Sequence, residues 1–186
     1  MSIEKITLGA GCFWCVENIF ARIEGIVSVV SGYADGDIIN PSYEQVCNGT
    51  ANHAEVVQIT FDTTLLDIET ILTVFFAIHD PTSLNRQGDD IGSQYRSTIL
   101  FHTTEQQVIA EARIAQLNST EEFEQAIVTT VKAVNNFSSA ESYHQDYVTN
   151  NPENKYCQLV VARKIQKFLS EFSHLLKSEE QAISAA

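Results

Sequence analysis

The sequence predicts an α+β domain in which a mixed sheet is covered by helices. Segments with strand-like and helix-like apolar spacing follow one another without strict alternation, which favours this class over a doubly wound parallel sheet. The chain has 186 residues, of which 44% are apolar and only three are prolines. Such a chain can bury one large core, so we expect a single catalytic domain over residues 1–186.

The first half of the chain predicts a strand, a glycine turn and a helix at its start. Residues 5–10 have the pattern of a short apolar strand, and the apolar residues of 16–23 have helical spacing. The two glycines between them permit a sharp turn, which puts Cys12 at or near a helix N-terminus. The other predictions for this half are a strand at 26–33, a loop at 34–53, a strand at 55–61 and a helix at 63–79.

The second half opens with a polar, glycine-rich stretch at 80–97. A loop of this length inside a compact domain is usually disordered or functional. The amphipathic C-terminal helix, from about residue 163, is expected to pack on the domain, with the last ten residues frayed. The predictions between them are a strand at 97–101, a helix opened by Thr104, a strand at 126–133 and a helix around 140–147.

Charge and hydropathy exclude several classes of function. The chain carries 24 acidic and 11 basic side chains, a net charge of −13, which opposes contact with nucleic acids or anionic membranes. It has no run of 18 apolar residues, and its N-terminus, MSIEKITLGAG, lacks the basic region and long apolar core of a signal peptide. We therefore expect no membrane span and a cytoplasmic location.

The four cysteines are too few and too unevenly spaced for a secreted disulfide framework. Cys12 and Cys15 form a C-x-x-C pair, which fits half of a zinc site, a redox dithiol, or one nucleophile with a sulfur neighbour. A zinc site needs a second such pair, and the sequence offers none, so we expect no metal. For Cys47 we expect a small buried core residue.

Cys12 is the candidate nucleophile because a glycine-rich turn presents it. A helix N-terminus contributes only about 0.3–1 kcal/mol to a thiolate, which is less than one pKa unit. No Lys, Arg or His lies within four residues of Cys12. Further activation of this thiol must therefore come from elsewhere in the fold or from the substrate.

Separate motifs are distributed along nearly the whole chain. They are GCFWCVE at 11–17, GY at 32–33, NPSYEQV at 40–46, HAE at 53–55, HDPT at 79–82, NRQGDDIGSQYRS at 85–97, AESYHQDY at 140–147 and KYC at 155–157. From about residue 5 to residue 170, these motifs resemble, in their order and spacing, those of the A-class peptide methionine sulfoxide reductases.

The resemblance implies a two-layer α+β sandwich, built as a ferredoxin-like plait with extensions. It also implies reduction of the S epimer of methionine sulfoxide, either free or in oxidised peptides and proteins. No metal or organic cofactor is implied, and thioredoxin or another dithiol is the expected external reductant. We expect a monomer.

The resemblance further implies a role for each residue that matches a family motif. Cys12 corresponds to the attacking cysteine, Glu55 to the acid and Cys157 to the usual resolving cysteine. The implied substrate contacts are Phe13 and Trp14 around the methyl group, Tyr43 and Tyr95 at the sulfoxide oxygen, and Asp90 as a site carboxylate.

The chemistry accounts for these residue types. Reduction of a sulfoxide needs a nucleophile at sulfur and a proton at oxygen, which Cys12 and Glu55 can supply. A free glutamate with a pKa of about 4.3 is almost fully ionised at neutral pH, so burial or the nearby sulfur must raise the pKa of Glu55. We expect this pair to hold one proton between them.

Two positions depart from the commonest family pattern. Cys15 stands where the family often has glycine, so Cys15 and Cys157 are both candidate resolving thiols. We favour Cys157, carried by the polar stretch 149–156, while a bridge from Cys12 to Cys15 or a relay through both remains an alternative. Asn52 replaces a usual glycine, and asparagine tolerates the positive φ that such a turn needs.

Two other functions compete with this interpretation. A thioredoxin-like oxidoreductase would use Cys12 and Cys15 directly on protein disulfides, and a binding module would use C-x-x-C only structurally. The first would reduce insulin disulfides without turning over methionine sulfoxide, and the second would do neither. Among the remaining polar residues, we expect His53 and His144 to stabilise loops, and Asp90 and Arg96 can simply pair within theirs.

Overall fold

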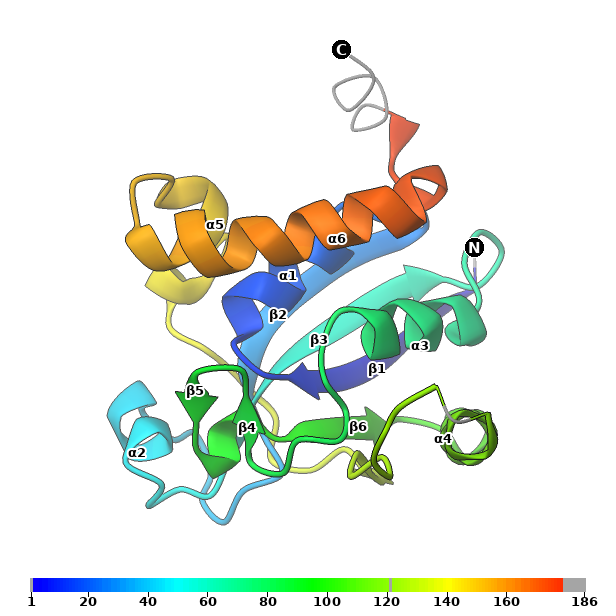
Figure 1. Cartoon of the computed structure of the whole chain (residues 1–186). Helices are drawn as coiled ribbons and strands as arrows, with labels where there is room; N and C mark the ends of the chain where they lie inside the picture. Colours follow the sequence, from blue (N-terminus) through cyan, green and yellow to red (C-terminus); the bar gives the residue numbers. More distant parts are fainter. Residues whose placement is uncertain (1, 121, 179–186) are drawn as a thin grey trace.

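The computed structural model, which describes residues 2–120 and 122–178, contains a six-stranded sheet in the order β7-β6-β1-β3-β2-β8 (Figure 1). Every neighbouring pair is antiparallel except β6 and β7, which are parallel. The strands are β1 (Ile3–Ala10), β2 (Ile26–Ala34), β3 (Ala54–Asp62), β6 (Ser97–Phe101), β7 (Thr130–Ala133) and β8 (Ser138–Ser139).

The four central strands and two helices form a ferredoxin-like plait. Along the chain the order is β1, α1 (Phe13–Phe20), β2, β3, α3 (Ile68–Ala77) and β6. In space these strands lie in the order β6-β1-β3-β2, so each helix connects two strands that are separated by one other strand. β7 and β8 extend the two edges of this sheet. The predicted α+β class, with a mixed sheet covered by helices, is confirmed.

Helices cover the sheet and close the core. α6 (Ala162–Phe172) packs against both α1 and α3, while α4 (Thr104–Ser119) packs against β6 and β7 (Figure 1). The predicted C-terminal helix is therefore confirmed, although it ends at Phe172. Leu176 then pairs with Ile23 beyond the end of α1. Of the last ten residues, which were expected to fray, 179–186 lie outside the described residues.

Side-chain caps fix where several helices begin. Asp67 accepts a hydrogen bond from the Thr70 N–H, so α3 begins at Ile68, five residues later than expected. A capping box between Ser42 and Gln45 starts α2 (Tyr43–Cys47) within the stretch that was expected to be only loop. That prediction was wrong at this point because a single turn of helix has too little apolar periodicity to be recognised.

The polar stretch at 80–97 is built from short ordered pieces. It contains a two-stranded hairpin, β4 (Arg86–Gln87) and β5 (Asp90–Ile91), and a 3₁₀ turn at Ser93–Tyr95. The Gln87 side chain holds the loop by bonding both the N–H and the carbonyl of Asp80, each at 3.0 Å. A polar loop of this kind reaches order through side-chain hydrogen bonds rather than apolar burial.

Two predictions in the second half were wrong in their details. The helix expected around 140–147 is instead a 3₁₀ turn at Ser142–His144, followed by Asp146 in the left-handed conformation with φ 50° and then by α5 (Tyr147–Asn150). β7 begins at Thr130, four residues after the predicted start. A π-helical turn at Cys157–Val161 precedes α6, and such turns occur frequently at functional sites.

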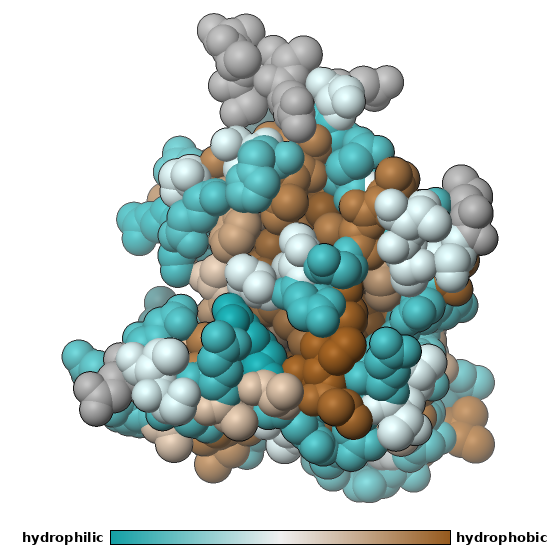
Figure 2. Space-filling model, turned by 90° about the vertical axis from the view of Figure 1, so that its right-hand side faces the viewer, coloured by the Kyte–Doolittle hydropathy of each residue, from teal (hydrophilic) through white to brown (hydrophobic). Residues whose placement is uncertain are grey.

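The face that carries α3 and α4 has an interrupted band of apolar surface (Figure 2). A shallow hollow of about 240 Å³ lies there between the two helices, lined in part by Leu72 and Ile109. In residues 2–120 and 122–178, no helix is long and apolar enough to cross a membrane.

Candidate active site

The turn from β1 into α1 presents Cys12. β1 ends at Ala10, Gly11 takes φ 87°, and Cys12 is the N-cap residue of α1. The Cys12 sulfur accepts the backbone N–H of Trp14, which favours a thiolate at this position. The prediction that Cys12 lies at a helix N-terminus is therefore confirmed. Its side chain is nearly covered, with 7% of its surface exposed.

Glu55 approaches the same helix N-terminus from the sheet. It lies on β3 opposite Tyr33 of β2, and its Oε2 accepts the Phe13 N–H at 3.2 Å. Burial, and next the charge of Cys12, raise the pKa of the Glu55 carboxyl well above its usual value, while the Phe13 hydrogen bond opposes this. The expected direction of this shift is confirmed.

Three of the four cysteines lie together. Cys12, Cys15 and Cys157 form one buried cluster with Val161 at the point where the π-helical turn meets α1. A hydrogen bond between the sulfurs of Cys12 and Cys15, together with burial, raises the pKa of Cys12. The same hydrogen bond lowers the pKa of Cys15. The Cys12 thiol therefore tends to hold its proton in spite of its position at the helix N-terminus.

Cys157 faces the other two cysteines from the C-terminal segment. Burial, followed by the charge of Cys12, raises the pKa of its thiol above the usual value. Its N–H donates to Asn154 Oδ1 at 3.3 Å, and the same amide oxygen accepts the Tyr156 N–H at 2.9 Å. Asn154 thus fixes the turn that brings Cys157 into the cluster.

The aromatic pair Phe13 and Trp14 forms a wall beside Cys12. Phe13 is 1% exposed, and its ring lies 5.8 Å from Tyr33 and 5.1 Å from His144, measured between ring centroids. The Trp14 indole N–H donates to His144 Nδ1 at 3.1 Å. Trp14 also stacks on Tyr147, with centroids 3.7 Å apart and planes 5° from parallel. Tyr147 therefore covers one face of the Trp14 ring.

Tyr43 and Tyr95 lie within electrostatic reach of Glu55. Burial and a hydrogen bond with Cys47 raise the pKa of the Tyr43 phenol. Burial and then the charges of Glu55 and Asp90 raise the pKa of Tyr95. Both phenols consequently keep their protons at neutral pH and remain hydrogen-bond donors.

Cys47 is not the buried core residue that we expected. It is exposed at the end of α2, where its thiol bonds the Tyr43 hydroxyl one turn earlier in the helix. The expectation was wrong because the capping box starts a helix here, which turns position 47 outward while Val46 fills the core at 1% exposed.

Asp90 and Arg96, which could have paired within their loop, have different partners. The Tyr156 hydroxyl donates to Asp90 Oδ2 at 2.6 Å, and Arg96 forms an ion pair with Asp35 at 3.1 Å. Asp90 and Tyr156 also line a hollow of about 280 Å³ next to the cysteine cluster. The Tyr156 hydroxyl is within hydrogen-bonding reach of the Cys12 and Cys15 sulfurs as well.

Tyr156 and Glu141 are site residues that sequence reasoning missed. Glu141 accepts the Tyr33 hydroxyl at 2.7 Å and the Tyr43 N–H at 3.0 Å, so it orients residues on both sides of Glu55. Their only signal was membership of the motifs AESYHQDY and KYC. Neither residue type suggested a partner, because the partners lie between 66 and 108 residues away along the chain.

Histidines stabilise the loops around the site, as expected. His53 is buried and its Nδ1 lies 2.8 Å from the carbonyl oxygen of Ala51. Asn52, between them, takes φ 52°, which confirms that asparagine supports the turn before Glu55. His144 accepts the Trp14 indole N–H, and burial lowers its pKa. A neutral imidazole is consistent with this acceptor role.

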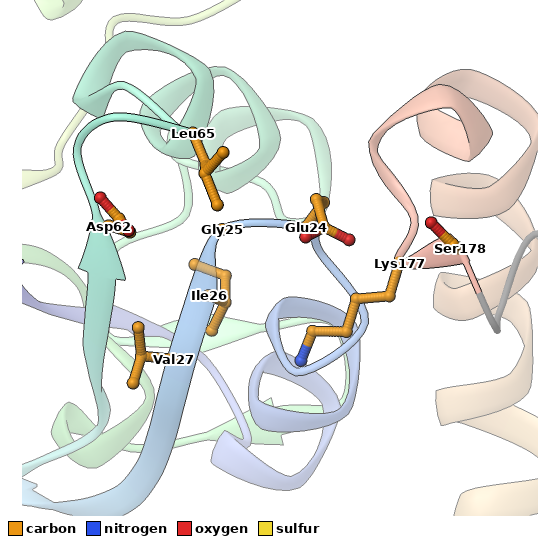
Figure 3. Close-up of a pocket in the computed structure, with 8 residues that line it drawn as sticks. All are labelled: Glu24, Gly25, Ile26, Val27, Asp62, Leu65, Lys177 and Ser178. Carbon is orange, nitrogen blue, oxygen red and sulfur yellow. The ribbon is translucent and has the colours of Figure 1, made fainter. Parts of the chain in front are cut away.

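A separate hollow of about 440 Å³ lies away from these residues (Figure 3). It opens at Ile26, the first residue of β2, whereas Tyr33 and its partner Glu55 lie near the other end of that strand. None of the expected site residues lines it. Within residues 2–120 and 122–178, no group of three or more His, Cys, Asp or Glu side chains is placed to hold a metal ion.

The family model described as peptide methionine sulfoxide reductase matches residues 4–176 of this chain. The chain belongs to this family. The reductase is 51% identical to the peptide methionine sulfoxide reductase MsrA of Haloquadratum walsbyi, over 93% of this chain and 98% of that protein. It is 48% identical to the MsrA of Chromobacterium violaceum, over 95% and 100% of the two chains. The predicted family is thus confirmed.

Solved structures agree with this assignment. The reduced form of Mxr1 from Saccharomyces cerevisiae superposes on the reductase with a TM-score of 0.76 and 32% identity, covering 83% of this chain and 89% of that one. Mxr1 has also been solved in complex with Trx2, and that structure matches the fold with a TM-score of 0.54 and 24% identity, over 78% and 84% of the two chains.

Proposed function

We propose that this reductase converts the S epimer of methionine sulfoxide, free or in peptides and proteins, to methionine, with Cys12 as nucleophile and Glu55 as acid. One observation carries the proposal. The Phe13 N–H at the start of α1 bonds the Glu55 carboxylate, and the next N–H, from Trp14, bonds the Cys12 sulfur. A carboxyl group and a thiol therefore meet at one helix N-terminus, where a sulfoxide can contact both.

The first step transfers oxygen from the substrate to Cys12. The sulfur of Cys12 attacks the sulfoxide sulfur and forms a bond to it, and the oxygen then moves to the Cys12 sulfur as the substrate S–O bond and the new S–S bond break, which gives methionine and Cys12 sulfenic acid. The substrate sulfur gains two electrons, and the Cys12 sulfur loses two. Because the sulfoxide oxygen becomes more basic as the bond breaks, a proton must reach it in the transition state.

Glu55 supplies that proton. Its raised pKa keeps a useful fraction of the carboxyl protonated near neutral pH, which an exposed glutamate would not do. The Cys12 thiol has a raised pKa too, so it also holds its proton before attack, and the pair then carries two protons rather than the single proton that we expected. Transfer to the sulfoxide oxygen leaves Glu55 ionised, and the proton of the Cys12 thiol restores the acid.

The remaining expected residues bind the substrate in this proposal. The hydroxyls of Tyr43 and Tyr95 donate to the sulfoxide oxygen and stabilise the charge that develops there. Phe13 and Trp14 enclose the methyl group, which orients the sulfur because one buried carbon contributes only about 0.8 kcal/mol. Asp90 acts through its hydrogen bond from Tyr156, next to the sulfurs.

A second thiol then resolves the sulfenic acid. We favour Cys157, whose thiol condenses with Cys12 sulfenic acid to give a disulfide and one molecule of water. Its burial in the cysteine cluster with Cys12 supports this choice. The hydrogen bond between Cys12 and Cys15 equally supports a local bridge, which would then pass to Cys157 by thiol–disulfide exchange.

We propose thioredoxin as the reductant that reopens the disulfide. The complex of Mxr1 with Trx2 supports this partner, and so does the resemblance on which it was first expected. We also propose that the chain forms a single catalytic domain, is a monomer and acts in the cytoplasm. No metal or organic cofactor takes part in any of these steps.

Replacement of Cys12 by serine tests the reaction. We expect reduced protein to convert S-methionine sulfoxide to methionine, measured by chromatography with dithiothreitol as reductant, and Cys12→Ser to abolish conversion while its thermal unfolding stays near that of the unmodified chain. Activity retained in Cys12→Ser would overturn the proposal. Insulin-disulfide reduction without sulfoxide turnover would instead assign a thioredoxin-like dithiol function to Cys12 and Cys15.

Mass mapping identifies the resolving thiol. Reduced protein receives one equivalent of S-methionine sulfoxide, is alkylated and digested, and its bridged peptides are identified. We expect a peptide pair that joins Cys12 to Cys157. A product in which Cys157 is fully alkylated and Cys12 is joined to Cys15 would overturn the choice of Cys157 but not the attack by Cys12.

A further inference from the structure

Glu17 is a buried carboxylate that the reaction above does not use. It lies on α1 and is 4% exposed, among apolar neighbours such as Val16 and Phe20. Burial raises the pKa of this carboxyl to about 7, although a hydrogen bond from Asp146 opposes the shift. A charged group is rarely kept in such a place unless its contacts need it.

Glu17 bonds the approach to the C-terminal segment through two backbone N–H groups, and it also contacts the Ser31 side chain of β2. Glu17 Oε2 accepts the backbone N–H of Asp146 at 3.0 Å, and the Tyr147 N–H also bonds this carboxylate. Trp14 lies one turn earlier on the same face of α1 and stacks on the Tyr147 ring. One face of α1 therefore holds two consecutive residues, one through a carboxylate and one through an aromatic stack.

Asp146 and Tyr147 directly follow a part of the chain that is tied to β2. The Gln145 side chain clamps the preceding turn to β2 by bonding the N–H of Ser31 at 3.0 Å and its carbonyl at 2.9 Å. Asp146 then takes the left-handed conformation, and its own side chain does not cap α5. Beyond it, the chain runs through residues 147–157 to Cys157. We call Asp146 and Tyr147 the hinge.

Hydrogen bonds of Asn154 tie the segment after the hinge into one unit. Asn154 Nδ2 donates to the Tyr147 hydroxyl at 3.2 Å, and Asn154 Oδ1 accepts the N–H groups of Tyr156 and Cys157. A shift at Tyr147 is therefore passed through Asn154 to Cys157 without a long flexible link. The position of the hinge on α1 consequently sets the position of the Cys157 thiol.

We propose that Glu17 is a positioning residue for the resolving step, because it anchors the hinge on α1 and so sets how Cys157 meets Cys12. This inference rests on the proposed function, in which Cys157 resolves the Cys12 sulfenic acid. Attack on the sulfoxide does not depend on the anchor, since the backbone amides of Phe13 and Trp14, and not the hinge, hold Glu55 and Cys12. Loss of the anchor therefore slows disulfide formation and leaves methionine release unchanged.

The test separates the two steps in a Cys15→Ser background, which removes the competing nearby thiol. Glu17→Ala removes the oxygens that accept the N–H groups of the hinge, and Glu24→Ala makes the same change at an exposed position beyond α1. A first-turnover burst of methionine measures attack. Trapping by dimedone measures the sulfenic acid that persists, and mass analysis measures the Cys12–Cys157 bridge.

We expect Glu17→Ala to release methionine within about twofold of its background and to form the bridge at least about tenfold more slowly, with more dimedone adduct. Glu24→Ala should match the background in both steps. Tyr147→Phe keeps the stack on Trp14 but removes the hydroxyl that Asn154 bonds, so it should also slow the bridge and leave methionine release unchanged. It also guards against a Glu17 variant that fails to fold.

Trp14 supplies an independent readout because it is the only tryptophan in the chain. We expect Glu17→Ala to change its emission, and Glu24→Ala to leave it unchanged. Unchanged bridge formation in Glu17→Ala would overturn the inference, and so would an equal loss of both steps. Failure of the unmodified chain to release methionine would instead contradict the proposed function itself.

Discussion

At the scale of single residues, two amides decide the chemistry of the site. A helix leaves its first N–H groups without partners inside the helix, and in α1 these groups bond Glu55 and Cys12. Both donors are backbone amides whose positions the helix fixes. Burial meanwhile raises the pKa of the carboxyl and of the thiol, which favours their protonated forms. The site thus stores a proton beside its nucleophile.

Glu55→Gln tests this stored proton. The glutamine oxygen can still accept the Phe13 N–H, so we expect the turn around Cys12 to persist while the acid is lost. The rate of methionine formation should fall by about 10²-fold or more, the usual contribution of a general acid. Single-turnover methionine release at neutral pH provides the measurement. A rate within a few fold of the unmodified chain would show that the proton comes from elsewhere.

Tyr156→Phe tests a residue that was not predicted. The hydroxyl donates to Asp90 and lies near both sulfurs of the C-x-x-C pair, where it lowers the pKa of Cys12 and of Cys15. Its removal should raise the pH at which these thiols react with iodoacetamide, followed by mass spectrometry of the peptide that contains them. The thiol of Cys47, exposed at the end of α2, is an internal control whose alkylation should not shift.

Residues could be predicted from the sequence where a local pattern carried the chemistry. GCFWC and HAE indicated Cys12 and Glu55, and the structure brings both to the start of α1. Tyr156 could not be predicted, because its role depends on Asp90, which is 66 residues away. The error at Cys47 has a similar cause, since its exposure follows from a cap set at Ser42.

At the scale of elements, the strand, glycine turn and helix around Cys12 form one unit. Gly11 takes φ 87°, and a Cβ added there would lie 2.7 Å from Gln87 Cγ. That side chain cannot easily move, because its amide bonds both the N–H and the carbonyl of Asp80. The turn therefore needs glycine for its conformation and also for space.

The pair Gly11→Ala and Gly49→Ala separates these two requirements. Gly49 has φ 77° with nothing within 4 Å of an added Cβ, so its substitution should cost about 1–2 kcal/mol from the left-handed backbone alone. Gly11→Ala should cost clearly more, because Gln87 must shift as well. Thermal unfolding measures both, and each kcal/mol corresponds to about 2–4 °C at this chain length. Equal losses in the two variants would mean that Gln87 gives way freely.

Elements were predictable where apolar periodicity persisted over several turns or strand residues. β1, β2, β3, β6 and the long helices follow from such patterns. The stretch 140–147 was predicted to be helical, yet its side chains bond distant partners: Glu141 bonds Tyr33, His144 bonds Trp14 and Gln145 bonds Ser31. Tertiary hydrogen bonds there outweigh the local preference for helix.

At the scale of the whole molecule, the strand order explains why these segments meet. The β6-β1-β3-β2 order places the end of β1, with Cys12 after it, next to the start of β3, which carries Glu55. The sequence pattern predicted the class of fold but could not supply this order, since apolar spacing does not encode which strands are neighbours. The resemblance implied a ferredoxin-like plait, and the four central strands have the order of that plait.

Burial shifts the pKa values of several groups in opposite directions, and these shifts make the stability of the whole molecule depend on pH. Burial lowers the pKa of His79 to about 4, so stability from its neutral form is lost as the pH falls from about 6.5 toward 4. Burial raises the pKa of Glu55, and that of Glu17 to about 7. As the pH falls below about 7, these carboxyls take up protons in the folded chain before they do so in the unfolded chain, so the stability rises.

The two effects oppose one another between about pH 4.5 and 6.5, so the free energy of unfolding of each variant is compared with that of the unmodified chain across this range. Glu55→Gln removes one carboxyl that gains stability in acid, so its unfolding free energy, from urea titrations, should rise less or fall more than that of the unmodified chain as the pH decreases. His79→Gln removes the opposite contribution, which is about 3 kcal/mol for a fully buried histidine shifted this far. Its stability should therefore rise as the pH decreases, although it starts lower at neutral pH because the bonds to Phe75 and Ser97 are weakened. Parallel curves for the two variants would mean that neither group carries the pH dependence.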